Sequence, residues 1–98
     1  MKAKDKLKKI ILETIDEFQT NEKIEIARNN EIVKDKMADA IVKSYYKDKK
    51  RPQLIFLVAN ILEEFQNKGD IIIFSDLSTK TTKVRIGEVI ENKLVSKK

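Results

Sequence analysis

The densest cluster of charged side chains in the sequence lies directly before Pro52. It is the segment Lys47-Asp48-Lys49-Lys50-Arg51, which holds four cations in five residues. Clustered positive charges repel one another unless a polyanion lies near them. Lys ammonium groups bind phosphate as point charges, and Arg guanidinium groups pair bidentately with phosphate or with the edge of a guanine. The segment therefore predicts contact with the phosphates of a nucleic acid.

The side chains on which most enzyme sites depend are missing. The 98 residues include no Cys and no His, which excludes thiolate nucleophiles, zinc-thiolate sites, imidazole bases and the Ser-His-Asp triad. Two Gly residues cannot build a glycine-rich phosphate loop. Asp35 and Asp39 share a helix face, but no further acids join them in the pattern of a magnesium-dependent nuclease. We expect no enzyme activity, no metal and no cofactor.

The net charge of +5 is distributed in blocks along the chain. Residues 1–27 are neutral overall, residues 28–51 carry +4, residues 52–77 carry −3 and residues 78–98 carry +4. A surface that serves only solubility intersperses its charges. We therefore expect one positive face, formed by residues 43–51 and 80–85.

Hydrophobic periodicity predicts three helices in the first two thirds of the chain. The first covers residues 3–19, and its apolar face can pack on the domain or on a second copy of the chain. The second runs from about residue 30 to 45, after a short strand at 23–27. The third begins at Pro52, a favoured first helical residue, and is closed by Gly69.

In the last third of the chain, two runs of strand-forming residues around a polar segment predict a β-hairpin over residues 71–86. Ile71-Ile72-Ile73-Phe74 forms its first strand, residues 76–82 its polar tip and Lys83-Val84-Arg85-Ile86 its returning strand. Residues 87–98 fit either a helix or a second hairpin. We detect no internal repeat.

The order of helix, strand, two helices and hairpin resembles winged helix-turn-helix proteins. The specific stretch is Ile61-Leu62-Glu63-Glu64-Phe65-Gln66-Asn67-Lys68-Gly69, which is similar to the end of a recognition helix in winged-helix regulators. The resemblance implies one α+β domain over residues 1–98, with helix 52–68 in the major groove and hairpin 71–86 as the wing. The segment Tyr45–Arg51 is longer than the usual turn of three or four residues.

The resemblance assigns DNA contacts to three groups of residues. The approach to the third helix supplies phosphate ligands, the exposed face of that helix reads bases, and the hairpin tip contacts a neighbouring backbone. These residues are Lys47, Lys49, Lys50, Arg51, Gln53, Phe56, Asn60, Lys80, Thr81, Lys83 and Arg85. The N-terminal helix, residues 1–20, is assigned to dimerisation through Leu7, Ile11, Ile15 and Phe18.

These assignments predict a homodimeric transcriptional regulator that binds double-stranded DNA. One alternative is a DNA-binding adaptor of a plasmid or virus that binds a centromere and spreads along DNA. Another is a protein-interaction module, in which Phe56, Tyr45 and Tyr46 form an apolar patch for a protein partner. No apolar run approaches the roughly 20 residues of a membrane span, and no signal peptide is recognised, so we expect a cytoplasmic protein.

Overall fold

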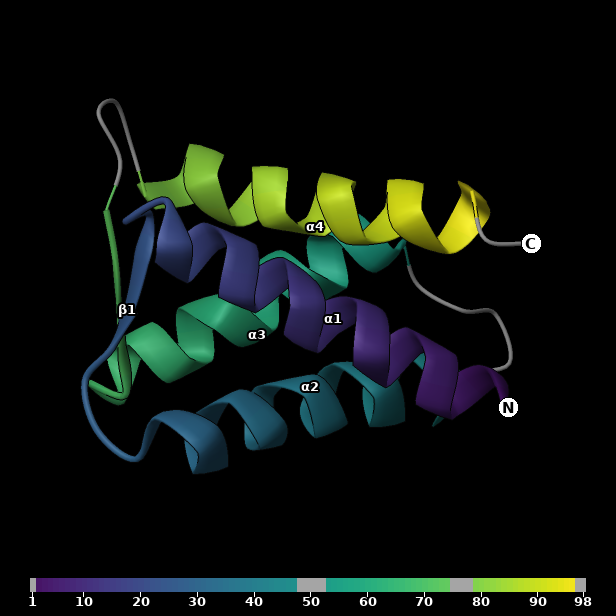
Figure 1. Cartoon of the computed structure of the whole chain (residues 1–98), viewed down its shortest axis with the longest axis horizontal. Helices are drawn as coiled ribbons and strands as arrows, with labels where there is room; N and C mark the ends of the chain where they lie inside the picture. Colours follow the sequence, from purple (N-terminus) through teal and green to yellow (C-terminus); the bar gives the residue numbers. More distant parts are fainter. Residues whose placement is uncertain (1, 48–52, 75–78, 97–98) are drawn as a thin grey trace.

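The computed structural model describes residues 2–47, 53–74 and 79–96, which form four helices and two short strands. In chain order these are α1 (Ala3–Thr20), β1 (Ile24–Ile26), α2 (Asn30–Lys47), α3 (Leu54–Asn67), β2 (Ile71–Ile73) and α4 (Thr79–Ser96). Successive helices run in opposite directions along the long axis, and the two strands lie together across one end (Figure 1). We call this the strand end. The opposite end, where α1 and α3 begin and α2 and α4 finish, is the helix end.

The core lies between the four helices and beneath the strands. Each helix contributes apolar residues spaced three or four apart, which places them on one face of the helix. Leu7, Ile11, Met37, Ile41, Val58, Leu62, Ile86 and Ile90 are all fully enclosed. The apolar periodicity read from the sequence correctly located α1, α2 and α3, because each has one continuous apolar face to bury.

The two strands pair antiparallel, with Ile24 opposite Ile73, Glu25 opposite Ile72 and Ile26 opposite Ile71. Backbone hydrogen bonds extend the pairing at both ends, since Phe74 N–H donates to the Lys23 carbonyl at 2.8 Å and Ala27 N–H donates to the Asp70 carbonyl at 2.9 Å. The sheet therefore joins two segments that lie far apart in the chain.

The chain contains an internal repeat that our sequence interpretation missed: a helix–strand–helix unit occurs twice. The first unit is α1-β1-α2 and the second is α3-β2-α4. Residues 17–26 and 64–73 both begin with Glu-Phe-Gln and both carry Ile at the first and third strand positions. The strand register is symmetric about Glu25 and Ile72, which are themselves equivalent in the two units. Such reciprocal pairing is the pattern of a two-fold interface.

The same turn ends the first helix of each unit. In the first unit, Glu22 N–H donates to Gln19 and Lys23 N–H donates to Phe18. The second unit repeats these bonds in the same order from Gly69 and Asp70. Both turns are Schellman motifs, which need a residue with positive φ after the helix cap. Gly69 meets that need with φ 81°, and Glu22 occupies the equivalent place with φ 60°.

The second helices of the two units also match in burial. Val33, Lys34, Met37, Ala38 and Ile41 of α2 correspond to Thr82, Lys83, Ile86, Gly87 and Ile90 of α4, all buried. Each unit thus carries one buried lysine that reaches back to an acid on its first helix. Lys34 bonds Asp16, and the Lys83 ammonium lies 3.8 Å from the Glu63 carboxylate.

The predicted winged helix is wrong, because residues 79–96 form the single helix α4 and the predicted hairpin over 71–86 is not formed. Lys83-Val84-Arg85-Ile86 alternates like a strand over four residues. Over a longer window, the buried positions 82, 83, 86, 87 and 90 follow helical spacing, and this longer pattern prevails. Among the described residues of the predicted hairpin, only 71–73 form a strand, and their partner is β1. Residues 75–78 lie outside the described part.

The residues assigned to dimerisation are core residues of the single chain. Leu7 and Ile11 are 0% exposed and Ile15 is 1% exposed, while Phe18 is half-buried and packs against the same core. Helix α1 contacts both α2 and α4. The apolar face of α1 is therefore covered from within the chain, and these residues cannot form a dimer interface without opening the core.

Candidate nucleic-acid interface

The described residues that were predicted to contact DNA lie at both ends of the bundle. Lys47 ends α2 at the helix end, whereas Lys80, Thr81, Lys83 and Arg85 lie in the first two turns of α4 at the strand end (Figure 1). A helix of 18 residues is about 27 Å long, which separates the two groups by the length of the bundle. The described parts of the expected positive face, residues 43–47 and 80–85, therefore lie at opposite ends of the bundle. Lys49, Lys50 and Arg51 lie outside the described residues.

The lysine at position 83 has a structural partner. Its side chain is 8% exposed and lies 3.8 Å from the Glu63 carboxylate. Arg85, two residues on, is exposed. Because Lys83 is enclosed and paired, it is a poor phosphate ligand, and the start of α4 retains one described cation from the predicted wing that is open to solvent.

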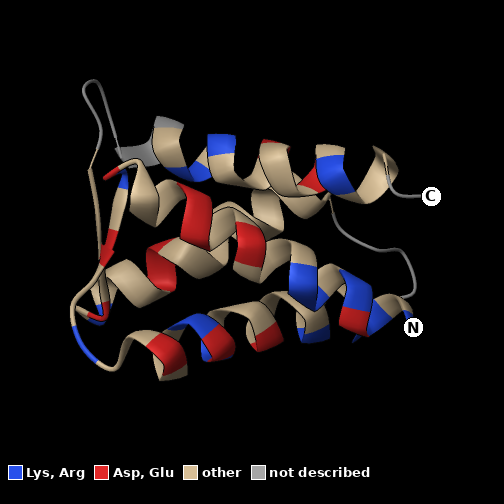
Figure 2. Cartoon of the chain, viewed as in Figure 1, with Lys and Arg blue, Asp and Glu red and all other residues tan. Residues whose placement is uncertain are grey.

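A positive cluster forms instead at the helix end. The first turns of α1 and the last turns of α2 lie side by side there, and Figure 2 shows Lys and Arg gathered over both. We define the basic end as the exposed lysines nearest these two helix termini, which are Lys2, Lys4, Lys43 and Lys47. One exposed acid, Asp5, lies among them. In the sequence, Lys47 is followed by Lys49, Lys50 and Arg51, which lie outside the described residues.

An ion-pair clamp fixes the relative position of these two helix ends. The Lys8 ammonium bonds Asp35 at 2.8 Å and Asp39 at 2.9 Å, so α1 is tied to α2 one turn inside the basic end. The two carboxylates raise the pKa of Lys8 above its ordinary value, and the Lys8 hydrogen bond lowers the pKa of Asp35. Lys4 and Lys43 each stand one helical turn beyond this clamp, and are therefore held near each other.

The lysines at the start of α1 oppose the helix dipole. The N-terminus of a helix carries partial positive charge, which favours Asp or Glu and disfavours Lys. Asp5 is the acid in the first turn of α1, yet Lys2 is its N-cap, Lys4, Lys6, Lys8 and Lys9 lie within its first turns, and no base lies in its last turn. Local helix stability therefore does not account for this arrangement.

The predicted base-reading residues are placed where a ligand can reach them. Gln53, Phe56 and Asn60 are all exposed, and 60% of the surface of Phe56 is open to solvent. Gln53 precedes the first residue of α3, and its side chain makes no capping hydrogen bond. Because α3 begins at the helix end, Gln53 and Phe56 at its start lie at the same end of the bundle as the basic end (Figure 1). Tyr45 and Tyr46, in contrast, are half-buried and pack against the core.

The lysines of α1 were missed because residues 1–27 are neutral overall. The neutral sum conceals a separation of charge along this segment, since five of its six lysines lie in residues 2–9 and five of its six acids lie in residues 13–25. A charge count over half a helix detects it, whereas a count over the whole segment does not. The structure adds that α2 brings its own terminal lysines to the same place.

Other site chemistries find no support in the described residues. Within residues 2–47, 53–74 and 79–96, no three Asp or Glu side chains gather closely enough to hold a metal ion. None of the described helices combines the length and the apolar character needed to cross a membrane.

Comparison with known protein families, with curated proteins and with solved structures finds no match to this chain.

Proposed function

We propose that the protein binds the phosphate backbone of duplex DNA through the basic end. The observation that carries the proposal is the gathering of Lys2, Lys4, Lys43 and Lys47 from two helix ends, in part against the helix dipole. Such a cluster costs stability unless a polyanion neutralises it. The exposed Gln53 and Phe56 at the same end, with Asn60 further along α3, offer amide and aromatic groups for contacts beyond the phosphates.

Titration of a fluorescent duplex at rising salt tests the proposal directly. Each phosphate contact contributes about −0.9 to the slope of log affinity against log salt. A triple variant of the basic end should therefore weaken binding and reduce the magnitude of the slope by about 3. Its substitutions are Lys4→Gln, Lys43→Gln and Lys47→Gln.

The chain offers a matched control that removes the same charge elsewhere. Arg28, Lys36 and Arg85 are exposed cations outside the basic end. Replacing all three with Gln should leave the salt slope nearly unchanged. If the two triple variants lose the same amount of DNA affinity, binding depends on the net charge of the protein alone, which would contradict a localised site.

Selection of bound sequences from a random duplex pool separates two forms of the proposal. A recovered motif that weakens in Gln53→Ala or Asn60→Ala would support sequence readout by α3 and a regulatory role. Recovery without a motif would leave binding to the phosphate backbone alone.

A further inference from the structure

The outer face of the strand pair carries a second surface of opposite character. Ile72 and Phe74 point outward from β2 and its continuation, with 44% and 45% of their surfaces exposed. Glu25 lies directly opposite Ile72 on β1 and is also exposed. Large apolar side chains left uncovered on one small face mark a contact surface more often than single scattered ones do.

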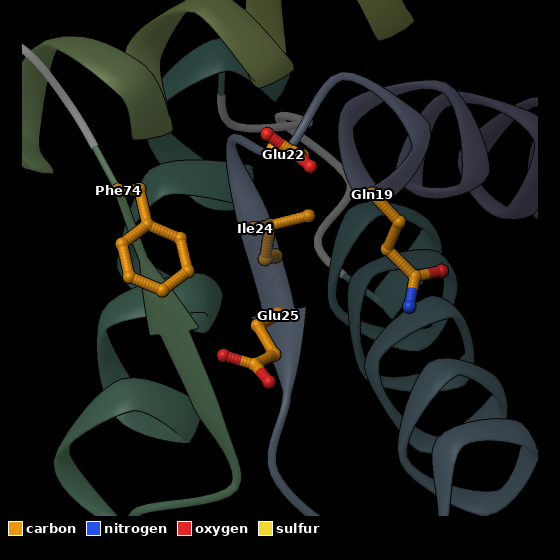
Figure 3. Close-up of a pocket in the computed structure, with 5 residues that line it drawn as sticks. All are labelled: Gln19, Glu22, Ile24, Glu25 and Phe74. Carbon is orange, nitrogen blue, oxygen red and sulfur yellow. The ribbon is translucent and has the colours of Figure 1, made fainter.

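This face forms one wall of a groove. The groove has a volume of about 440 Å³ and is lined by Gln19, Glu22, Ile24, Glu25 and Phe74. Figure 3 shows the Phe74 ring on one side, the Glu25 carboxylate beside it on β1, and Gln19 at the end of α1 on the other side. Ile24, which is 2% exposed, forms the apolar floor. Gln19 is held in place because its side-chain amide donates to Asn30 at 2.8 Å.

The internal repeat shows which of these residues the fold requires. Gln19 and Ile24 recur in the second unit as Gln66 and Ile71, so the turn and the core use them in both places. Glu22 and Glu25 do not recur, because their equivalents are Gly69 and Ile72. The two acids are therefore additions to the first unit that its backbone does not need. At position 22 the acid even replaces the glycine that the positive φ favours.

The chemistry of the groove selects its occupant. Its described lining contains two carboxylates and no cation, which repels phosphate and attracts an ammonium or guanidinium group. The face of an aromatic ring such as Phe74 attracts the same cations. The volume accommodates one or two side chains, whereas a stable dimer interface buries about 800 Å² on each partner. A short segment fits this surface better than a second folded copy does.

We propose that this groove docks a peptide segment of a protein partner, with a Lys or Arg against Glu22 and Glu25 and an adjacent apolar side chain against Phe74 and Ile24. This contact is independent of nucleic-acid binding, because the groove lies at the strand end and the basic end lies at the helix end. The protein then joins a basic partner segment at one end and a polyanion at the other.

Fluorescence anisotropy with the full chain and two labelled peptides tests this contact. One peptide alternates three lysines with two leucines, and its counterpart carries uncharged glutamine in place of lysine. The lysine peptide should bind saturably and the glutamine peptide should not. The double variant Glu22→Gly/Glu25→Gln should lower the affinity about tenfold, as expected for two exposed charge pairs. Glu88→Gln on α4 serves as the matched control and should bind like the parent protein.

Thermal unfolding of the same variants keeps the result separate from misfolding. Glu22→Gly relieves the backbone at position 22, so this variant should unfold at a higher temperature while it binds the lysine peptide more weakly. Unchanged peptide affinity in the double variant, or equal binding of both peptides, would overturn the proposal. Sedimentation of the protein alone adds a third outcome. A salt-sensitive dimer that Glu22→Gly abolishes would make a second copy the occupant, which also overturns it.

Discussion

Replacing Glu22 with glycine should stabilise the protein, although Glu22 is exposed and glycine usually weakens a chain. Glu22 follows the cap of α1 and has a φ of 60°, in the left-handed region. There the Cβ atom crowds the following carbonyl oxygen, at a cost of roughly 1–2 kcal/mol. Glycine has no such crowding, but it loses about 0.5–1 kcal/mol more conformational entropy on folding. The difference is a net gain of about 0.5–1 kcal/mol in the free energy of unfolding.

The gain should be visible as a rise in Tm. In a domain of this length, 1 kcal/mol corresponds to about 4–8 °C, so Glu22→Gly should raise the Tm by about 2–8 °C. Thermal and urea unfolding followed by far-ultraviolet circular dichroism measure both quantities. The urea midpoint should rise with an unchanged m-value, because the surface exposed on unfolding stays the same.

The second unit supplies the mirror experiment. Gly69 has a φ of 81°, and a Cβ atom added there would meet nothing within 4 Å. Gly69→Ala therefore changes backbone strain alone and should cost about 1 kcal/mol. Positions 22 and 69 lie at opposite ends of the strand pair, so the two changes in stability should add in a protein that carries both Glu22→Gly and Gly69→Ala. If Glu22→Gly leaves stability unchanged or lowers it, the strain assigned to position 22 is wrong.

Three further substitutions test other parts of the structure by unfolding measurements. Gly87→Ala should destabilise by about 1–3 kcal/mol despite the higher helix propensity of alanine, because its Cβ atom would lie 2.8 Å from the Ile55 carbonyl oxygen of the facing helix backbone. Lys8→Gln should flatten the pH dependence of stability. The lowered pKa of Asp35 contributes stability that is lost as pH falls below its ordinary value of 3.8, and the raised pKa of Lys8 contributes stability that is lost as pH rises above 10.5. Phe56→Ala should change stability by less than about 0.5 kcal/mol, since the ring is 60% exposed, and should weaken duplex binding if the ring contacts DNA.

Local elements could be read from the sequence wherever a single periodicity covers a whole segment. The apolar spacing of α1 and α3 is unambiguous over several turns, and Gly69 closes α3 by the capping turn that its position predicts. At the start of α4 two periods compete. Lys83-Val84-Arg85-Ile86 alternates over four residues, whereas Ile86, Ile90 and Leu94 follow a helical period over nine. In the structure this longer pattern prevails as α4, and Ile86 and Ile90 are fully buried.

The candidate site was predictable only in part, because ligands for one surface come from two elements. Lys47 and the cations that follow it are recognisable from their density in the sequence. Nothing in the sequence alone places Lys2 and Lys4 beside Lys43. That neighbourhood depends on the antiparallel packing of α1 on α2, which the Lys8 clamp with Asp35 and Asp39 holds in register.

The repeat explains why an apolar helix face was mistaken for a dimer interface. A single helix–strand–helix unit of this size has too little interior to cover Leu7, Ile11 and Ile15 by itself, so such a unit needs a partner. In this chain the second unit is that partner, and α4 covers α1 as a second copy would. Apolar spacing shows that a face must be buried but does not show by which chain. The recurrence of Glu-Phe-Gln followed by the Ile-x-Ile strand could have decided the question. The recurrence was obscured because the spacing between equivalent residues is not constant. Met37 and Ile86 of the second helices are two residues further apart in the sequence than Leu7 and Leu54 of the first helices.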